Sequence, residues 1–135
     1  MKTFVNILIS TLIILAGFVG IIAVNFLGTI LLKSLFGSGI SAEGTPLTQS
    51  SRIVFLIMIF IAGMVGAFII AILIKRKIWI HLGVFCGLAI IGDVFALKGQ
   101  LVDFPLWAKI VVLITIPLQV WIGGKMGLRL KKDQN

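Results

Sequence analysis

The sequence predicts an all-α membrane protein in which four transmembrane helices form an up-down bundle, a single transmembrane domain over residues 1–135. Hydrophobic residues make up 60% of the chain and charged residues only 12%, whereas an ordinary soluble domain is roughly 45–50% apolar. The mean hydropathy is +1.24. The apolar residues gather into four long runs, and cations stand at the ends of these runs. Lipid is a suitable solvent for such helices, because each helix satisfies its own backbone hydrogen bonds.

The first predicted span covers residues 4–32. As a helix these 29 residues would be about 43 Å long, more than the hydrocarbon core of about 30 Å, so we expect the helix to tilt or to protrude. Met1 and Lys2 followed by an apolar run are also typical of a secretory signal. The run is longer than the roughly 7–15 apolar residues of such signals, and no small-residue cleavage site follows it. We therefore interpret it as a membrane span.

Residues 33–52 are predicted to form an outer loop. This segment is rich in serine, glycine and threonine, a composition typical of loops. Near its end, Ser50 or Ser51 is placed to cap the next helix by accepting a hydrogen bond from a free backbone amide. We expect this loop to be the one sizeable part of the chain outside the membrane.

The second predicted span, residues 53–74, contains no charged residue and no Asn, Gln, Ser or Thr. Gly63, Ala67 and Ala71 recur at every fourth position, which places these small side chains on one face of a helix. Small side chains let another helix approach closely within a membrane. We interpret this span as a helix-packing element.

Three adjacent cations, Lys75, Arg76 and Lys77, separate the second run from the third. A connection this short requires the two helices to run antiparallel, and its charges require a water-exposed membrane face. These three residues are therefore the strongest determinants of topology in the chain.

The third predicted span covers residues 78–97 and contains a GxxxG pair, Gly83 and Gly87. The same spacing recurs near the end of the chain at Gly123 and Gly127. Because GxxxG faces are typical of closely packed membrane helices, both pairs indicate helix–helix contact.

The fourth predicted span covers residues 106–124. Gly99 is expected to end the preceding helix in a left-handed conformation, and Pro105 suits the first turn of the fourth, where its missing amide hydrogen costs nothing. Pro117 removes one backbone hydrogen bond and is expected to kink the helix. Residues 125–135 are expected to form a basic cytoplasmic tail.

The distribution of cations predicts the orientation of the bundle. In an up-down bundle, eight of the 12 Lys and Arg residues lie on the side of the termini and four on the other side. The excess predicts that both termini are cytoplasmic and that the protein spans the cytoplasmic (inner) membrane of a bacterium several times. The eight are Lys2, Lys75, Arg76, Lys77, Lys125, Arg129, Lys131 and Lys132, and the four are Lys33, Arg52, Lys98 and Lys109.

Asp93 is an acid within an apolar run, about 22 Å along the third span and so in the outer third of the membrane. An ionisable group at that depth is a candidate functional residue. If the third and fourth spans form an antiparallel hairpin, Lys109 lies at a similar depth. We therefore hypothesise a structural ion pair between Asp93 and Lys109, in which loss of one partner would cost about 3–5 kcal/mol.

Asn25 in the first span and Gln119 in the fourth extend this candidate into an intramembrane polar cluster of Asn25, Asp93, Lys109 and Gln119. One interpretation is a polar cavity that opens outward. The other is structural, with Asn25 in a single interhelical hydrogen bond and Gln119 bonding a neighbouring span or the carbonyl group that Pro117 leaves free.

The residue pattern predicts no catalytic, cofactor-binding or metal-binding site. Cys86 is the single cysteine. It is also the one further metal donor near His81, and it is rotated away from that side chain on a helix. No Ser or Cys has a base and an acid at a recognisable spacing. The net charge of +8 does not indicate nucleic-acid binding, because the cations flank membrane spans. We expect no enzymatic activity, no cofactor and no nucleic-acid partner.

The fourth span carries a pattern of proline, tryptophan and glycine that reads Pro105-Leu106-Trp107, then Ile116-Pro117, then Gly123-Gly124-Lys125. This pattern resembles that of small bacterial four-span membrane proteins of uncharacterised function. The resemblance covers about the last 30 residues together with the layout of four spans and an outer loop. It implies a fold and no activity, because the group has none assigned.

The functional expectation is a small integral membrane protein that acts as a non-catalytic accessory or helix-packing subunit. Small-residue faces on three spans favour it, since they exceed what one four-helix bundle needs. Its partners would be membrane lipids and either further copies of the chain or a larger membrane complex. The alternative is a small channel or transporter that uses the polar residues around Asp93.

Overall fold

The computed structural model describes residues 2–75, 77–99 and 101–133. This part of the chain contains four α-helices, a single short 3-10 helix and no strand. The elements are α1 (Lys2–Phe36), η1 (Gly37–Gly39), α2 (Gln49–Leu73), α3 (Ile78–Lys98) and α4 (Leu106–Asp133). All four α-helices are long and apolar enough to cross a membrane. The predicted all-α membrane protein is therefore confirmed at the level of its fold.

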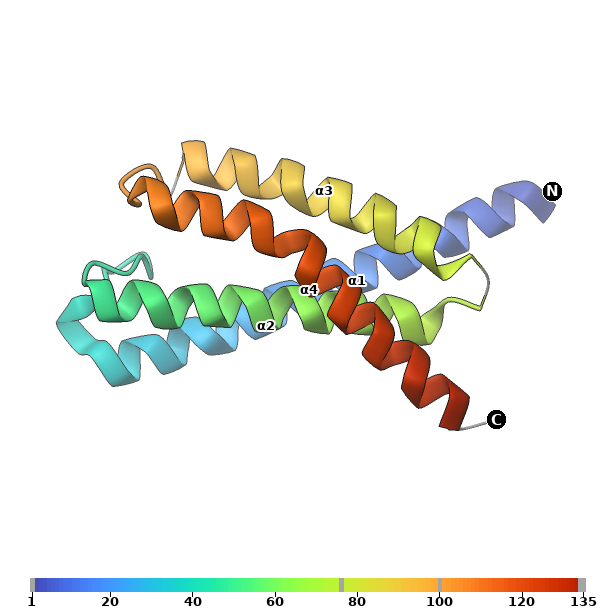
Figure 1. The fold of residues 1–135 in the computed structure, drawn as a ribbon, viewed down its shortest axis with the longest axis horizontal. Helices are drawn as coiled ribbons and strands as arrows, with labels where there is room; N and C mark the ends of the chain where they lie inside the picture. The colour runs from blue at the N-terminus through green and yellow to red at the C-terminus, as the bar shows by residue number, and fades with distance from the viewer. Residues whose placement is uncertain (1, 76, 100, 134–135) are drawn as a thin grey trace.

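The helices alternate in direction, as Figure 1 shows. The two termini and the α2–α3 connection lie at one end of the bundle, which we call the termini end. The α1–α2 connection (residues 37–48) and the α3–α4 connection (residues 99–105) lie at the other, which we call the loop end. In the view of Figure 1, α1 and α2 form one pair at the loop end, α3 and α4 form another, and α4 crosses α2 toward the termini end. This arrangement is the predicted up-down bundle.

The centre of the bundle is α2, which packs extensively against both α1 and α4. The small-residue face predicted for the second span meets the glycine pair of α4: a Cβ added at Gly123 would lie 3.0 Å from the Cβ of Ala67, and one added at Gly127 would lie 2.6 Å from that of Ala71. The same Cβ on Gly127 would lie 3.0 Å from the backbone oxygen of Phe68. The two helix backbones thus approach so closely that glycine is required on α4.

The hydrophobic core lies where all four helices meet. The side chains of Ile70, Phe85 and Ile116 are buried within it. From α1, Phe18 packs on this core, with its ring centroid 4.9 Å from that of Phe85. The remaining surface is rich in exposed leucine, isoleucine and phenylalanine, especially along α1, as expected for helices whose solvent is lipid.

The helices extend beyond the spans predicted for them, and α2, for example, begins at Gln49 instead of residue 53. The helix over the first span, 4–32, continues to Phe36, and the helix over the fourth, 106–124, continues to Asp133. The described residues of the basic segment 125–135 are therefore helical as far as residue 133. Cations in the last turn of a helix interact favourably with its C-terminal carbonyl groups, which explains why α4 does not end at the membrane boundary.

The extended part of α4 also contacts its neighbours. Lys125 places its ammonium group 4.0 Å from the ring centroid of Trp121, and Lys131 donates hydrogen bonds to the backbone oxygens of Ile72 and Ile74 at the end of α2. These bonds satisfy carbonyl groups that a helix end leaves free. Pro117 lies inside α4, and Figure 1 shows the helix bending part-way along, as the sequence predicted.

The start of α2 is capped by a residue that sequence reasoning missed. We expected Ser50 or Ser51 as the cap, but the N-cap is Thr48, whose hydroxyl accepts a hydrogen bond from the Ser51 amide at 3.3 Å. Ser51 completes a capping box by accepting from the Thr48 amide at 3.1 Å, and its hydroxyl also lies 3.1 Å from the backbone oxygen of Gly39. The buried Ser51 therefore joins the outer loop to α2.

The left-handed backbone conformation expected at Gly99 occurs elsewhere. Gly99 does end α3, but with φ −104°, and its amide bonds to the carbonyl oxygens of Phe95 and Ala96. In the described chain, Lys77 is the non-glycine residue with positive φ, at 53°. A left-handed conformation is uncommon for a residue with a Cβ, and here it turns the chain from α2 into α3.

Candidate functional site

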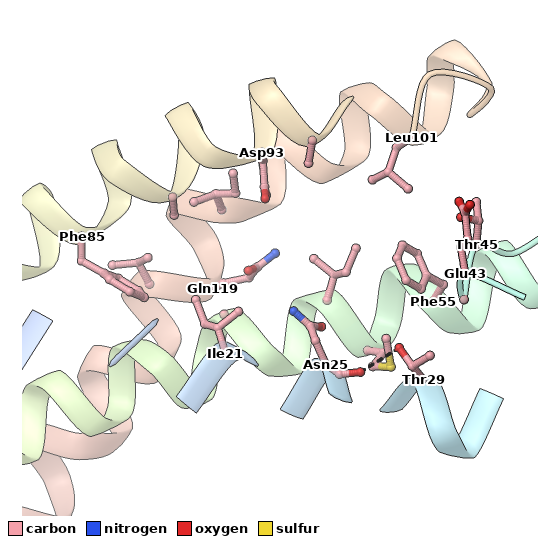
Figure 2. A pocket seen from close by; sticks show the side chains of 18 residues that line it. Ile21, Asn25, Thr29, Glu43, Thr45, Phe55, Phe85, Asp93, Leu101 and Gln119 are labelled. Carbon is pink, nitrogen blue, oxygen red and sulfur yellow. Dashed lines mark hydrogen bonds between the residues drawn. The ribbon is translucent and has the colours of Figure 1, made fainter. Parts of the chain in front are cut away.

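A cavity of about 310 Å³ separates the α1–α2 pair from the α3–α4 pair in the half of the bundle nearer the loop end (Figure 2). All four helices and both loop-end connections contribute to its wall. The polar residues that line it are Asn25, Thr29, Glu43, Thr45, Asp93 and Gln119, and its apolar lining includes Ile21, Phe55, Met58, Phe85 and Ile116. The cavity is thus an amphipathic site within the membrane-spanning part of the fold.

Three of the four residues predicted as a polar cluster line this cavity. Asn25 comes from α1, Asp93 from α3 and Gln119 from α4. Figure 2 shows the Asp93 carboxyl group pointing from α3 into the space between the helices, toward the side on which Gln119 and Asn25 lie. The structure thus brings these three residues to one cavity, as the cavity interpretation expects, and leaves its orientation in the membrane as a prediction.

Lys109 is not part of the cavity wall, and the hypothesised ion pair with Asp93 is wrong. The Lys109 ammonium group instead donates a hydrogen bond of 2.6 Å to the backbone oxygen of Val102, in the α3–α4 connection. Matching the two residues by their distance from the turn gave the depth of each in the membrane. It did not give their directions around the two helices, and Lys109 reaches the connection while Asp93 faces the cavity.

Gln119 is held in one orientation by Thr115. The side-chain amide nitrogen of Gln119 donates to the Thr115 hydroxyl at 3.0 Å, and that hydroxyl has its own acceptors in the backbone oxygens of Val111 and Val112, at 2.8 and 3.0 Å. Because the hydroxyl proton is committed to a carbonyl group, its oxygen accepts from Gln119. The hydrogen bond of Gln119 is thus to a residue of α4 itself, and neither to the carbonyl freed by Pro117 nor to a neighbouring span, the two structural interpretations.

Gly63 of α2 makes the position of Gln119 possible. Gln119 is only 3% exposed, and a Cβ added at Gly63 would collide with its side-chain oxygen, Oε1. The amide thus fills the space that the missing side chain leaves. Gly63 had been predicted as part of a packing face, and it serves the polar site as well.

Asn25 contributes an acceptor without a partner. Within the described chain, its side-chain oxygen Oδ1 is buried and has no hydrogen-bond partner. A buried acceptor of this kind costs about 1–3 kcal/mol relative to a paired one. The neighbouring Thr29 does not relieve it, because its hydroxyl donates to the backbone oxygen of Asn25, at 2.9 Å. Asn25 therefore keeps a buried, unpaired acceptor among the residues that line the cavity.

The cavity is open at one end and closed at the other. At the loop end its wall includes Glu43, which is exposed, and Leu101 from the α3–α4 connection. Toward the termini end it meets the hydrophobic core at Phe85, Ile116 and Val120. The cavity therefore extends from exposed residues at the loop end to tightly packed apolar side chains near the middle of the bundle.

Several residues of this site were not found from the sequence. Glu43, Thr45 and Phe55 lie in or just after the outer loop, and nothing in their spacing relates them to Asp93. The sequence offered one usable signal, the acid Glu43 itself. Glu43 lies in a loop of low charge, and this loop follows the span that contains Asn25. That both residues line one cavity depends on how the α1–α2 connection folds back, which local sequence does not encode.

The predicted topology determinants lie at the termini end. Lys75 and Lys77 are exposed in the α2–α3 connection, and Arg76 lies outside the described residues. Throughout the described ranges, no three His, Cys, Asp or Glu side chains gather closely enough to hold a metal ion.

Comparison with known proteins adds no relative: no family model matches the chain, and no curated protein or solved structure matches it.

Proposed function

We propose that this small multi-pass membrane protein is a carrier that binds a small amphipathic organic cation in the cavity at the loop end. The observation that supports it is the convergence of Asn25, Asp93 and Gln119, from three different helices, on one cavity of about 310 Å³. Intramembrane acids are costly to maintain and are therefore functional candidates. The sequence alone ranks a transporter second, after an accessory subunit, and the shared cavity is our reason for proposing a transporter first.

The chemistry of the wall favours a cation. Asp93 and Glu43 supply negative charge, and the described lining contains no Lys, Arg or His. The half-buried Phe55 adds an aromatic ring, and such rings attract organic cations by about 0.5–2 kcal/mol. A cation with an apolar body matches both the acidic and the apolar residues of the lining.

A carrier fits the cavity better than a channel does. A channel needs a continuous polar path, whereas this cavity ends at the packed core around Phe85 and Ile116. Passage across the membrane would require α3 to move relative to the other three helices. The contacts favour α3 as the moving element, because it packs far less extensively against the rest of the bundle than α2 does, whereas α4 is held closely against α2.

The proposed setting is the inner membrane of a bacterium with both termini in the cytoplasm, as the excess of cations on the termini side favours. The cavity then opens to the outside. A carrier in this orientation would take its cation from the outer face or release it there.

Binding of quaternary ammonium ions to purified protein tests the proposal. In mild detergent, calorimetric titration with the series from tetramethylammonium to tetrabutylammonium is expected to show saturable binding to the native protein, with a preferred size. Asp93→Asn is expected to weaken it at least tenfold, because one carboxylate near a desolvated cation contributes well over the 1.4 kcal/mol that a factor of ten represents.

The matched control is Asp103→Asn, because Asp103 is an exposed acid of the α3–α4 connection that does not line the cavity. It is expected to bind like the native protein. Absence of saturable binding in the native protein, or equal weakening by the two substitutions, would remove the basis for a cation site at Asp93.

An accessory role, the first expectation from the sequence, stays a second proposal on one specific observation. A Cβ added at Gly83, Gly87 or Gly92 of α3 would meet no described atom within 4 Å. A second copy of the chain, with the same GxxxG pair, would fit against this face. In a Cys86→Ser background, Gly87→Cys is expected to crosslink into dimers in native membranes. A chain that stays monomeric there would count against self-association.

A further inference from the structure

A second cavity, of about 730 Å³, lies at the termini end, on the opposite side of the core from Asp93. Its wall comes from the first turns of α1, the end of α2, the α2–α3 connection and the start of α3. The polar part consists of Asn6, Ser10, Lys75, Lys77 and His81, and the apolar part consists of Ile9, Ile13, Leu73 and Ile74. The lining is thus basic and polar on one side and aliphatic on the other.

A chain of contacts organises the polar side. His81 Nδ1 lies 3.0 Å from the backbone oxygen of Lys77, and because a carbonyl oxygen can only accept, this ring nitrogen carries the proton. His81 Nε2 lies 3.0 Å from the hydroxyl of Ser10 on α1. The ring therefore links α1 to the α2–α3 connection and fixes one wall of the cavity.

The backbone at Lys77 contributes to this arrangement. Its left-handed conformation, φ 53°, is costly for a residue with a side chain, yet it directs the Lys77 carbonyl group to His81 while leaving the side chain exposed on the cavity wall. A third cation nearby is engaged differently, since Lys131 donates to the carbonyl groups at the end of α2. Lys75 and Lys77 are thus the ammonium groups of the cavity.

We propose that this cavity is a binding site for an anionic phospholipid. Its phosphodiester lies between Lys75 and Lys77, and its acyl chains run along Ile9 and Ile13 toward the membrane interior. Basic pockets between transmembrane helices are suited to anionic headgroups. The aliphatic wall distinguishes a lipid from free phosphate, which has no use for it. This site is independent of the proposed carrier function.

Quenching of Trp79 fluorescence by brominated lipid tests the site, because Trp79 is exposed in the first turn of α3, two residues from both Lys77 and His81. Trp107→Phe with Trp121→Phe leaves Trp79 as the one tryptophan of the three. This variant is placed in phosphatidylcholine vesicles with graded fractions of brominated phosphatidylglycerol or brominated phosphatidylcholine. Phosphatidylglycerol is expected to bind near Trp79 several-fold more tightly than phosphatidylcholine.

Replacing both ammonium groups, as Lys75→Gln with Lys77→Gln, is expected to abolish that preference, since each cation near an anionic lipid contributes about fivefold in binding. Lys33→Gln with Lys98→Gln, which removes two cations at the loop end, is the matched control and is expected to keep it. Equal binding of the two lipids by the native residues, or a preference that survives loss of Lys75 and Lys77, would overturn the proposal. Displacement of phosphatidylglycerol by millimolar inorganic phosphate would overturn the assignment to lipid.

Discussion

Two glycine pairs with identical spacing have opposite surroundings in this bundle. Gly123 and Gly127 of α4 lie against α2 so closely that an added Cβ would meet backbone atoms, whereas an added Cβ at Gly83 or Gly87 of α3 would meet no described atom within 4 Å. Both pairs are GxxxG motifs in apolar helices. The spacing therefore indicates that a helix can be approached closely, and the fold decides whether its own chain does so.

The difference follows from the position of α2. Its small face is continuous through Gly63, Ala67 and Ala71, and α4 crosses it along this face. The facing surface of α4 is equally small, so the two backbones come into van der Waals contact over several turns. Where α3 meets the bundle, α3 presents its own larger side chains, such as Leu82 and Phe85. The glycines of α3 consequently lie on its outer side.

Substitution of Gly123 by leucine is expected to have the largest effect. The new side chain would meet the Met64 backbone oxygen and the Cβ of Ala67, and backbone atoms cannot move aside without separating the helices. Overpacking of this kind costs typically 1–3 kcal/mol, and we expect about 3 kcal/mol here. Unfolding in mixed micelles with increasing dodecyl sulfate, followed by circular dichroism, measures the loss.

Gly87→Leu is the matched control for that measurement. It adds the same side chain at the same kind of position, but with no described atom within 4 Å of its Cβ. The expected change in the free energy of unfolding is below about 0.5 kcal/mol. Similar losses at Gly123 and Gly87 would show that the two faces do not differ as described.

A second test concerns the point at which the packed face becomes the wall of the cavity. Gly63→Ala is expected to cost about 1–2 kcal/mol, because its Cβ would collide with the Gln119 side-chain oxygen and Gln119 is only 3% exposed. Gln119→Ala removes the obstacle and loses one hydrogen bond to Thr115. The same unfolding assay on the two single variants and the double variant gives their coupling.

The double variant is expected to be more stable than the sum of the single effects predicts, with a coupling of at least about 0.5 kcal/mol. Additive effects would mean that Gly63 and Gln119 do not share the space between α2 and α4. Gly63→Ala should also weaken binding of the ammonium probe, since it displaces a side chain of the cavity wall.

The sequence predicts the four spans, the up-down order and the packing face of α2, because each depends on local composition or helical period. Three of the four cluster residues were also found, since Asn25, Asp93 and Gln119 are polar groups in apolar surroundings. Lys109 was assigned wrongly for a physical reason. Distance from a turn gives depth in the membrane, but the rotation of each helix about its axis depends on tertiary packing.

The ends of the helices were harder to predict for another reason. Thr48 caps α2 only because Ser51 and the Gly39 carbonyl group complete the arrangement, and α4 continues to Asp133 partly because Lys131 finds acceptors at the end of α2. Partners distant in the chain determine both features. A reading of local propensities cannot include them.

Lys109→Met is expected to have the smallest effect, and it tests how α3 is held. An ion pair with Asp93 would have tied α3 to α4, and its loss would cost about 3–5 kcal/mol. In the structure Lys109 donates to the Val102 backbone oxygen instead, from a half-buried position. Removal of such a bond costs about 1 kcal/mol.

The unfolding assay used for Gly123 measures this loss of stability. The control is Lys98→Met, which removes an exposed lysine at the end of α3. A loss above about 3 kcal/mol would restore the ion pair and make α3 a firmly held element, whereas a small loss leaves α3 loosely packed, as its movement in a carrier requires.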